Sequence, residues 1–451
     1  MKKRVLLISY YFAPQNTIGA VRPTKFAKYL TKMGYEVTVI CGVGMNGAQD
    51  PTLKRDLAEL SDVHAVSEWN PLRAYQARKN RKAALAKEAK AKQPAAMAEG
   101  AAKQAEPPAS KGFVHRLANG LYLFACVLSD KSFGRRVKRE LRKLSGTYDV
   151  VFSSYAPISV HRAARAAKKS GLAKRWIADF RDEVNMSFGW QEGVRTRFVK
   201  MLRKDADLLC AVSDGVLNMM HLQDVGHVLS NGFDREDIRD VLVLPADKPP
   251  LLRIVYCGQF RMGRRNVENR DIKPFFSALR TLIEQGMCKA EELSLLYAGD
   301  EGEVFTAYAS AFGLEARVMD FGRVSREQSL ALQKSADILL MASLNVAGQT
   351  GILTGKLFEY MMMEKPIVCC MAGDLAGSEL KQVLEATGLG ICCEQAGGEA
   401  EQQALYQYLR ELMARWKQGQ GLLVSKNITE QSKYDYSRIT EELAAWMKDV
   451  V

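Results

Sequence analysis

The chain has 451 residues, of which 47% are hydrophobic and 25% charged, and its formal net charge is +13. A single hydrophobic core rarely extends beyond ~300 residues, so this length predicts two domains. The composition excludes a disordered or fibrous protein. No run in the sequence approaches the ~20 apolar residues that a membrane-spanning helix needs, which excludes an integral membrane protein.

The N-terminal half alternates apolar strands with amphipathic helices. The opening segment MKKRVLLISYYFAP starts like a signal peptide, but its apolar run is short and lacks a small-residue cleavage site, so we interpret it as a first strand. Strands are expected at 4–9, 36–41, 149–153, 175–179 and 207–212, and helices at 24–33, 159–169 and 195–204. This alternation predicts a doubly wound α/β domain over residues 1–243.

A basic segment interrupts this half of the chain. Residues from about 70 to 112 are rich in Ala, Lys, Gln and Pro and cannot bury a core, so we expect an insertion there. The stretch 70–143 holds 18 basic and 5 acidic residues and carries the whole excess of positive charge. Apolar side chains such as Leu121 and Phe124 lie beside it, which favours an anionic membrane surface as partner over plain solvated charge. Nucleic acid is not expected, because no recognition motif accompanies the charge.

The C-terminal half repeats the alternation after a linker near residues 244–250. Its strands are expected at 251–256, 293–298, 318–321, 337–341 and 366–371, and its helices at 272–285, 303–311, 326–334 and 355–363. This predicts a second Rossmann-like domain over 244–435, followed by a terminal amphipathic helix within 436–451. The nine cysteines lack the paired spacing of a zinc or redox motif, so we expect reduced, buried thiols in a cytoplasmic protein.

Two segments that follow strands are suited to bind an anion. Ligands of such domains bind at the carboxyl ends of the strands. In the loop 14–23, Gly19 lets the backbone approach a ligand and Arg22 precedes a helix N-terminus. The alternative there is a plain strand-to-helix turn. Directly after the strand 251–256 come Gly258, Arg261 and Arg264, whose guanidinium groups could clamp a diphosphate, the alternative being an exposed basic loop.

The segment 348–360 (GQTGILTGKLFEY) places three glycines before a helix. The amides of Gly355, Lys356 and Leu357 and the Lys356 ammonium suit phosphate oxygens, and Glu359 could accept hydrogen bonds from both hydroxyls of a ribose. Leu357 stands where a Walker A loop has Ser or Thr, which argues against an ATPase. A capped helix with a solvated Lys and Glu is the alternative.

The segment 179–182 (DFRD) follows another strand and faces the same side. Asp182 could orient an acceptor hydroxyl and Arg181 could steady a phosphate, so both are candidate catalytic residues. The alternative is an Asp–Arg pair that holds a loop.

Together these motifs resemble the family 4 glycosyltransferases, in particular those that build bacterial surface polysaccharides. The similarity covers nearly the whole chain except about residues 45–145. The segments that carry it are LLISYYFAP, DFRD, VSDG, SNGFD, YCGQF, YAGD, FGRVS, SADILL and TGKLFEYMMMEKPIV.

The resemblance implies a GT-B fold, with two Rossmann-like domains facing across a cleft and a C-terminal helix returning toward the N-terminal domain. It also implies a nucleotide diphosphate-sugar as co-substrate, bound mainly by the C-terminal domain, an acceptor held by the N-terminal domain, retention of anomeric configuration and no required metal or other cofactor. Glu359 matches the ribose-binding glutamate of the family, Arg261 or Arg264 its diphosphate-binding residue, and Gly19 its early loop.

Two positions depart from the family pattern: Gly351 stands where a glutamate is usual, and Arg181 precedes Asp182 where His-Asp is common. We therefore expect a glycosyltransferase of polysaccharide biosynthesis, peripheral on the inner face of the membrane, that uses a glycan or lipid-linked acceptor. A catalytically silent nucleotide-sugar-binding scaffold and a nucleotide-sugar epimerase are the alternatives.

Overall fold

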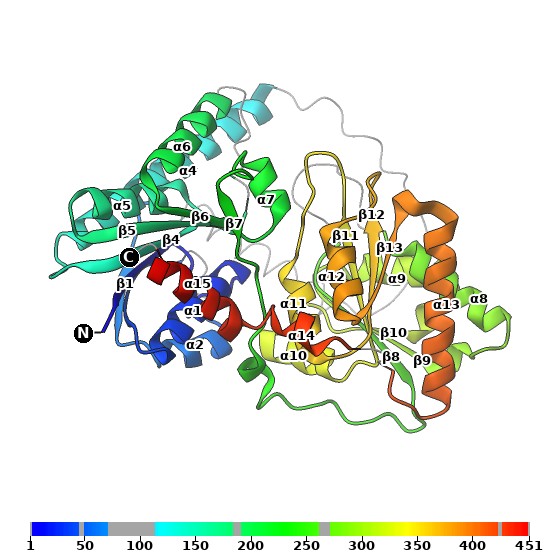
Figure 1. Ribbon diagram of the computed structural model, residues 1–451. Coiled ribbons are helices and arrows are strands. Elements are labelled where there is room, and N and C mark those ends of the chain that lie inside the picture. The colour runs from blue at the N-terminus through cyan, green and yellow to red at the C-terminus, as the bar shows by residue number, and fades with distance from the viewer. Residues whose placement is uncertain are drawn as a thin grey trace, which may run out of the picture.

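The computed structural model describes residues 2–44, 49–70, 113–182, 184, 191–260, 271–422 and 426–449, and it contains two parallel β-sheets (Figure 1). The first has seven strands in the order β3-β2-β1-β4-β5-β6-β7, and the second has six in the order β10-β9-β8-β11-β12-β13. The prediction of two Rossmann-like domains is confirmed.

The N-terminal sheet is made of β1 (Arg4–Ser9), β2 (Glu36–Gly42), β3 (Asp62–Val66), β4 (Tyr148–Tyr155), β5 (Ala173–Phe180), β6 (Leu208–Ala211) and β7 (Gly226–Val228). Its helices are α1 (Ile18–Lys32), α2 (Pro51–Leu57), α4 (Phe113–Leu141), α5 (Ile158–Lys169), α6 (Gln191–Asp205) and α7 (Asp214–Met219). Because both faces of the sheet are covered, its strands are apolar on both sides: Leu6 packs with α4 and α5, and Leu7 with α1.

The C-terminal sheet is made of β8 (Leu252–Cys257), β9 (Leu293–Ala298), β10 (Val318–Asp320), β11 (Ile338–Leu344), β12 (Ile367–Ala372) and β13 (Gly390–Glu394). Helices α8 (Lys273–Glu284), α9 (Gly302–Ser310) and α13 (Gly398–Lys417) share one core with it. Helices α10 (Arg326–Lys334), α11 (Gly355–Met363) and α12 (Glu379–Thr387) share the other. β8 and β11 are neighbouring parallel strands, so the loops that follow them, which hold the predicted donor residues, leave the sheet at the same edge.

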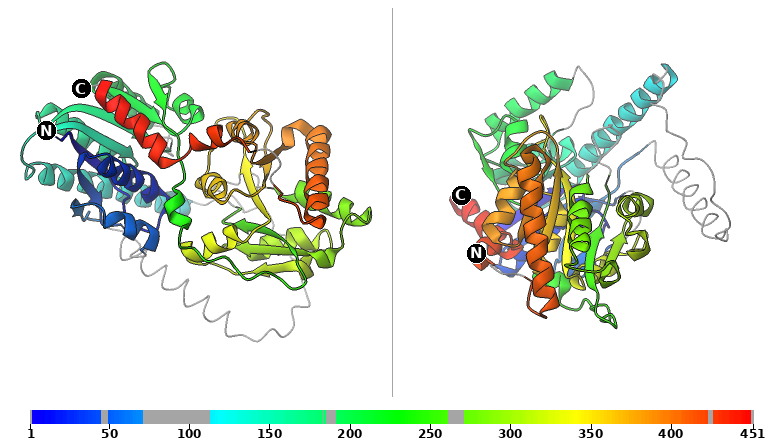
Figure 2. Two further views of the ribbon diagram at one scale, coloured as in Figure 1. Left: turned by 60° about the horizontal axis from the view of Figure 1, so that its bottom comes forward. Right: turned by 90° about the vertical axis from the view of Figure 1, so that its right-hand side faces the viewer.

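The last helix returns to the N-terminal domain, as predicted. After α14 (Ile428–Ser432), the chain pairs Phe233 with Asp435 and continues into α15 (Tyr436–Asp449). Tyr436, Ile439 and Leu443 are buried in the core that α1 shares with the N-terminal sheet, and Figure 2 shows α15 beside α1. This crossing makes the C-terminal end of the chain part of the first domain.

Three sequence predictions need comment. The predicted loop 14–23 is wrong in its second half, because α1 begins at Ile18 and includes Gly19 and Arg22. The insertion predicted over about 70–112 lies, apart from Asn70, outside the described residues. Within the described part of the chain, no helix is both long enough and apolar enough to span a bilayer.

Candidate functional site

The C-terminal domain brings three of the predicted donor residues together. The Lys356 Nζ lies 4.2 Å from the centroid of the Tyr256 ring, at the end of β8. A Cβ placed on Gly258, whose φ is +122°, would lie 2.9 Å from the same Nζ. Because Gly355 and Lys356 open α11, a helix N-terminus and an ammonium group meet at the carboxyl edge of the sheet, an arrangement that attracts anions.

Leu357 does not take part as predicted. Its side chain is fully buried in the core, and its amide donates to the Thr354 carbonyl at 3.0 Å. The amide of Gly355, at the first helical position, has no acceptor within the helix. Beside it, the Thr354 Oγ1 is buried and makes no hydrogen bond within the described residues. These two groups are the better candidates for a phosphate contact.

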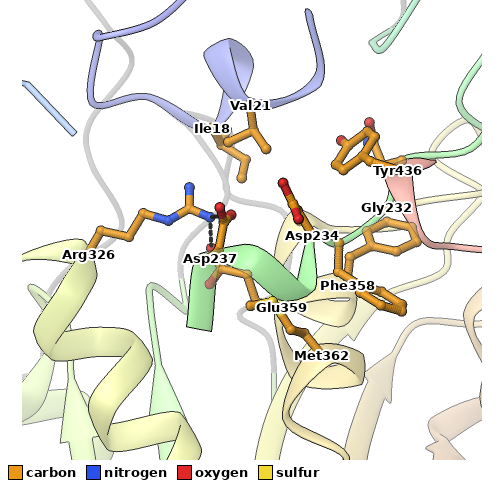
Figure 3. Close-up of a pocket in the computed structure, with 13 residues that line it drawn as sticks. Ile18, Val21, Gly232, Asp234, Asp237, Arg326, Phe358, Glu359, Met362 and Tyr436 are labelled. Carbon is orange, nitrogen blue, oxygen red and sulfur yellow. Dashed lines mark hydrogen bonds and ion pairs between the residues drawn. The ribbon is translucent and has the colours of Figure 1, made fainter. Parts of the chain in front are cut away.

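Glu359 lies one turn further along α11 and faces the space between the domains (Figure 3). Its side chain is 23% exposed. The Arg326 Nη2 lies 3.4 Å from its Oε1, and the Gln333 Nε2 donates to its Oε2 at 3.3 Å. The carboxylate is therefore fixed in orientation but keeps lone pairs for a diol.

Gly19 and Arg181, predicted separately, form one unit in the N-terminal domain. The Arg181 Nη1 donates to the Gly19 carbonyl, and its Nε donates to the Tyr155 carbonyl at 2.6 Å. The Gly19 carbonyl is open to this bond because Pro23, four residues later in α1, has no N–H to donate. The guanidinium carbon also lies 4.7 Å from the centroid of the Tyr11 ring. Arg181 thus ties the end of β5 to the start of α1.

Asp182 lies next to this unit and is open to solvent. Its side chain is 72% exposed, and its Oδ2 lies 3.8 Å from the Arg181 Nε. An exposed carboxylate beside a fixed guanidinium can accept a hydrogen bond from an incoming hydroxyl.

Arg22 is buried in an ion pair rather than facing a ligand. Its Nε and Nη2 donate to the two Asp179 oxygens at 3.0 and 2.6 Å. Its other donors go to the carbonyls of Leu229 and Ser230 and to the Asn231 Oδ1. All five N–H groups are used within the fold, so the geometry does not favour the predicted anion contact. The arginines Arg261 and Arg264 lie outside the described residues.

The two helix N-termini of the site meet across the domain boundary. A Cβ on Gly355 would lie 2.5 Å from the Cδ1 of Ile18, the residue before Gly19. Elsewhere along the boundary, the Ser213 Oγ donates to the Gly351 carbonyl at 2.9 Å, and the Gly215 amide donates to the Glu379 Oε1 at 2.7 Å. The cavity lined by Ile18, Arg326 and Glu359 has a volume of only ≈ 40 Å³, so the domains stand closed on each other.

Arg326, which the sequence analysis missed, links the domains at this cavity. Its guanidinium lies 3.4 Å from Asp50, 3.2 Å from Asp237 and 3.4 Å from Glu359. It occupies the first position of α10, where the helix dipole disfavours a positive charge. A basic residue at a helix N-terminus was the sequence signal that could have identified it.

Three buried carboxylates of the N-terminal domain already hold a cation. Asp56, Asp234 and Asp237 have oxygens within 4.8 Å of one another, a spacing that could suit a metal ion. The Lys25 Nζ lies 2.6, 2.7 and 2.5 Å from them. Burial alone would lower the pKa of Lys25, but these three carboxylates raise it. Lys28 also pairs with Asp56 and Asp234, and Arg326 with Asp237, so three cations together balance the charge of the three carboxylates.

Comparisons with known proteins identify the fold. The sequence matches no protein-family profile and no curated protein. Among solved structures, it resembles a glycosyltransferase from Rickettsia africae, with 15% identity, a TM-score of 0.55 and coverage of 100% of this chain and 98% of that one. It also resembles sucrose-phosphate synthase from Thermosynechococcus elongatus, with 12% identity, a TM-score of 0.58 and coverage of 100% and 99%.

A third similar structure is an epimerase. The UDP-GlcNAc 2-epimerase from Neisseria meningitidis, bound to UDP-GlcNAc, has 10% identity, a TM-score of 0.51 and coverage of 99% of this chain and 100% of that one. At such identities the similarity concerns the fold. The chain has the two-domain GT-B fold over its full length.

Proposed function

We propose that the protein is a glycosyltransferase that moves a sugar, with retention of configuration, from a nucleotide diphosphate-sugar to a membrane-proximal glycan or lipid-linked acceptor in polysaccharide biosynthesis. The observation that carries this proposal is that the α11 N-terminus, with Lys356 and Glu359, meets the start of α1 across the domain boundary, where Arg181 holds Gly19 and Asp182 lies beside it. The family resemblance of the motifs supports it.

Each group has a role that follows from its chemistry. Glu359 binds the ribose hydroxyls, while the Gly355 amide, Lys356 and the glycine at 258 approach the diphosphate. Arg261 and Arg264 follow Gly258 in sequence and are proposed to add positive charge there. Negative charge develops on the leaving diphosphate, so these donors stabilise the transition state without a metal. Asp182 orients the acceptor hydroxyl.

The domains must open for this reaction. The present cavity of ≈ 40 Å³ has room for one or two water molecules. A nucleotide-sugar therefore enters an open form, in which the contacts of Ser213 with Gly351 and of Gly215 with Glu379 are released, and the domains then close around it. Closure excludes water from the reacting centre, which favours transfer over hydrolysis.

The test is a panel of UDP-, GDP-, dTDP- and ADP-sugars, measured by thermal shift and by slow hydrolysis of the donor. One donor should raise the melting temperature and be hydrolysed, and Glu359→Gln should abolish both effects. Glu385→Gln, an exposed glutamate on α12, is the matched control and should leave both unchanged. Failure of every donor to stabilise the wild-type protein overturns the proposal.

An epimerase is the second candidate, because similar structures include one bound to UDP-GlcNAc. The same panel distinguishes the two functions when the products are examined by NMR. An epimerase returns an intact nucleotide-sugar with one inverted sugar carbon, whereas a transferase releases free nucleoside diphosphate. A catalytically silent scaffold would be stabilised by a donor and would convert none of it.

A further inference from the structure

A second cavity lies in the N-terminal domain, away from the donor residues of the C-terminal domain. Its volume is ≈ 180 Å³. Tyr10 and Tyr11, which follow β1, and Ala156 and Pro157, which follow β4, form its floor. The inner face of α4 forms its wall with Tyr122, Cys126, Ser129, Asp130 and Phe133.

The position of this cavity favours a ligand. β1 and β4 are neighbours in the sheet. The next strand after β1 is added toward one edge of the sheet, and the next strand after β4 is added toward the other edge. Crevices at such a topological switch point are where open α/β sheets bind ligands. Arg181 stacks on Tyr11 at 4.7 Å, so the cavity adjoins the Gly19–Arg181 unit.

The chemistry of the lining suits a sugar. Three tyrosine side chains contribute aromatic surface, and Ser129 and Asp130 add hydrogen-bonding groups, whereas the Tyr10 hydroxyl donates to Glu68 Oε1 at 3.0 Å. The Asp130 Oδ1 accepts from the Ser159 amide at 3.2 Å, which fixes the carboxylate at the cavity wall. Burial raises the pKa of this carboxyl group.

The opposite face of α4 carries a stripe of two kinds of residue. Leu121, Phe124 and Leu128 are followed at the same three- and four-residue spacing by Lys131, Arg135 and Lys138. Five of the six are exposed, and Leu128 is half-buried. This spacing places all six on one side of the helix. In Figure 2 the N-terminal end of α4 extends away from the body of the chain.

An apolar half followed by a basic half complements an anionic bilayer. The apolar side chains enter the headgroup region, and the basic side chains attract the lipid phosphates. With its outer face on a bilayer, α4 would hold the cavity at the level of the lipid headgroups.

We propose that the cavity beneath α4 binds the sugar head group of a membrane-anchored glycolipid, the acceptor, while the outer stripe of α4 rests on the bilayer that carries it. This inference rests on the proposed function, and it names the acceptor class and its site. The donor side of the boundary lies across the Gly19–Arg181 unit, so the acceptor hydroxyl would face the enclosed donor.

Cys126 provides a direct probe of the cavity. It lines the wall, and it is exposed whereas the other eight cysteines are buried. N-ethylmaleimide should therefore label it first, which intact mass spectrometry measures. Octyl β-D-glucoside, kept below its micelle concentration, should slow labelling by about tenfold at ten times its dissociation constant. Glucose should protect weakly and octanol should not protect. Equal labelling with and without octyl glucoside overturns the proposal.

Two variants on the same helix separate the faces of α4. Ser129→Phe fills the cavity and should abolish protection by octyl glucoside, whereas Arg135→Phe on the outer face should retain it. Protection that survives Ser129→Phe contradicts the site.

Phe124→Ser tests the docking surface. It removes an exposed side chain and should reduce sedimentation with phosphatidylcholine vesicles that contain phosphatidylglycerol. Leu242→Ser, which removes a side chain exposed elsewhere, is the control. Unchanged sedimentation contradicts the docking surface.

Donor binding is measured on the same samples by thermal shift. A protein that binds a donor but shows no protection of Cys126 refutes the acceptor site and leaves the proposed function standing. A protein whose Cys126 is protected but that binds no donor refutes the proposed function instead.

Discussion

Gly19 and Arg181 show how a single missing side chain can shape the site. A Cβ on Gly19 would lie 2.0 Å from the Arg181 Nη1. Gly19→Ala should therefore displace Arg181 from the Gly19 carbonyl and lower the free energy of unfolding by ~1–3 kcal/mol. Chemical denaturation measures this effect, and donor hydrolysis should fall with it.

Gly193→Ala is the matched control for that substitution. Gly193 lies in α6 with nothing within 4 Å of its added Cβ, so helix propensity alone should stabilise the variant by up to ~1 kcal/mol. If the two variants were equally stable, the contact between Gly19 and Arg181 would carry no energetic weight.

His161 should give the protein a pH-dependent stability. It is fully buried beside Ser153, and burial lowers its pKa to about 3. Between the ordinary value of ~6.5 and 3, the unfolded chain binds a proton that the folded chain does not. The free energy of unfolding should therefore fall by ~1.4 kcal/mol per pH unit as pH decreases through this window, and the effect is absent above it.

The test compares urea denaturation at several pH values between 4 and 7, which covers most of this window and the start of the plateau above it. In His161→Phe, the slope of the unfolding free energy against pH should decrease by the contribution of about one proton. This variant should also be less stable at pH 7, because Ser153 loses its hydrogen-bond partner. His227→Gln, an exposed histidine in β7, should keep the slope. An unchanged slope in His161→Phe would contradict the assignment.

Side-chain pairing is where the sequence predictions reached their limit. The positions of Gly258, Lys356 and Glu359 relative to strand ends could be predicted, because carboxyl ends of parallel strands share one edge. The pairing of Arg22 with Asp179 joins residues 157 apart, and no local pattern encodes it. An arginine near a helix N-terminus suits an anion and a buried carboxylate equally well.

At the scale of elements, continuous apolar strands and the helices that end in glycine were predictable. The bounds of β1, β9, α10 and α11 agree with the expected ranges. The start of α1 was missed because Pro23 suggested a loop, whereas a proline in an early turn removes only the bond to Gly19. Helix α4 was missed because its apolar and basic residues surround the helix without one dominant buried face.

The contact between α7 and the Gly351 loop depends on two glycines. A Cβ on Gly215 would lie 2.6 Å from both the Gly351 Cα and the Thr350 carbonyl oxygen, which belong to the other domain's backbone. Gly215→Ala should therefore force this edge of the boundary open. We expect a larger radius of gyration in small-angle scattering and weaker stabilisation by the donor. Gly120→Ala, with nothing within 4 Å, is the control and should scatter as the wild type does.

For the whole molecule, the two-domain layout followed from length and from the repeated alternation of strands and helices. The contacts between the two domains could not be predicted from the sequence. The boundary is held by Arg326, Asp50 and Asp237, which come from distant parts of the chain, and charged residues at such spacing look like ordinary surface in a sequence.

Arg326 is expected to be the main electrostatic link between the domains. Its side chain is 13% exposed and lies among Asp50, Asp237 and Glu359. Arg326→Gln removes the cation that Asp50 and Glu359 share, whereas Asp237 keeps Lys25, and removing one partner of a buried pair costs ~3–5 kcal/mol. Chemical denaturation should detect most of this loss. Donor affinity should also fall, because Glu359 loses the contact that orients it.

Arg323→Gln is the control that separates a buried link from a surface one. Arg323 precedes Arg326 by three residues and pairs with Asp300. Its side chain is 74% exposed, so the loss of this pair should cost at most ~1 kcal/mol.

Asp50→Asn should weaken the boundary from the N-terminal side without touching Glu359. If Asp50→Asn lowers donor affinity as Arg326→Gln does, domain closure rather than the orientation of Glu359 limits binding. If only Arg326→Gln does so, the guanidinium acts on the donor site through Glu359.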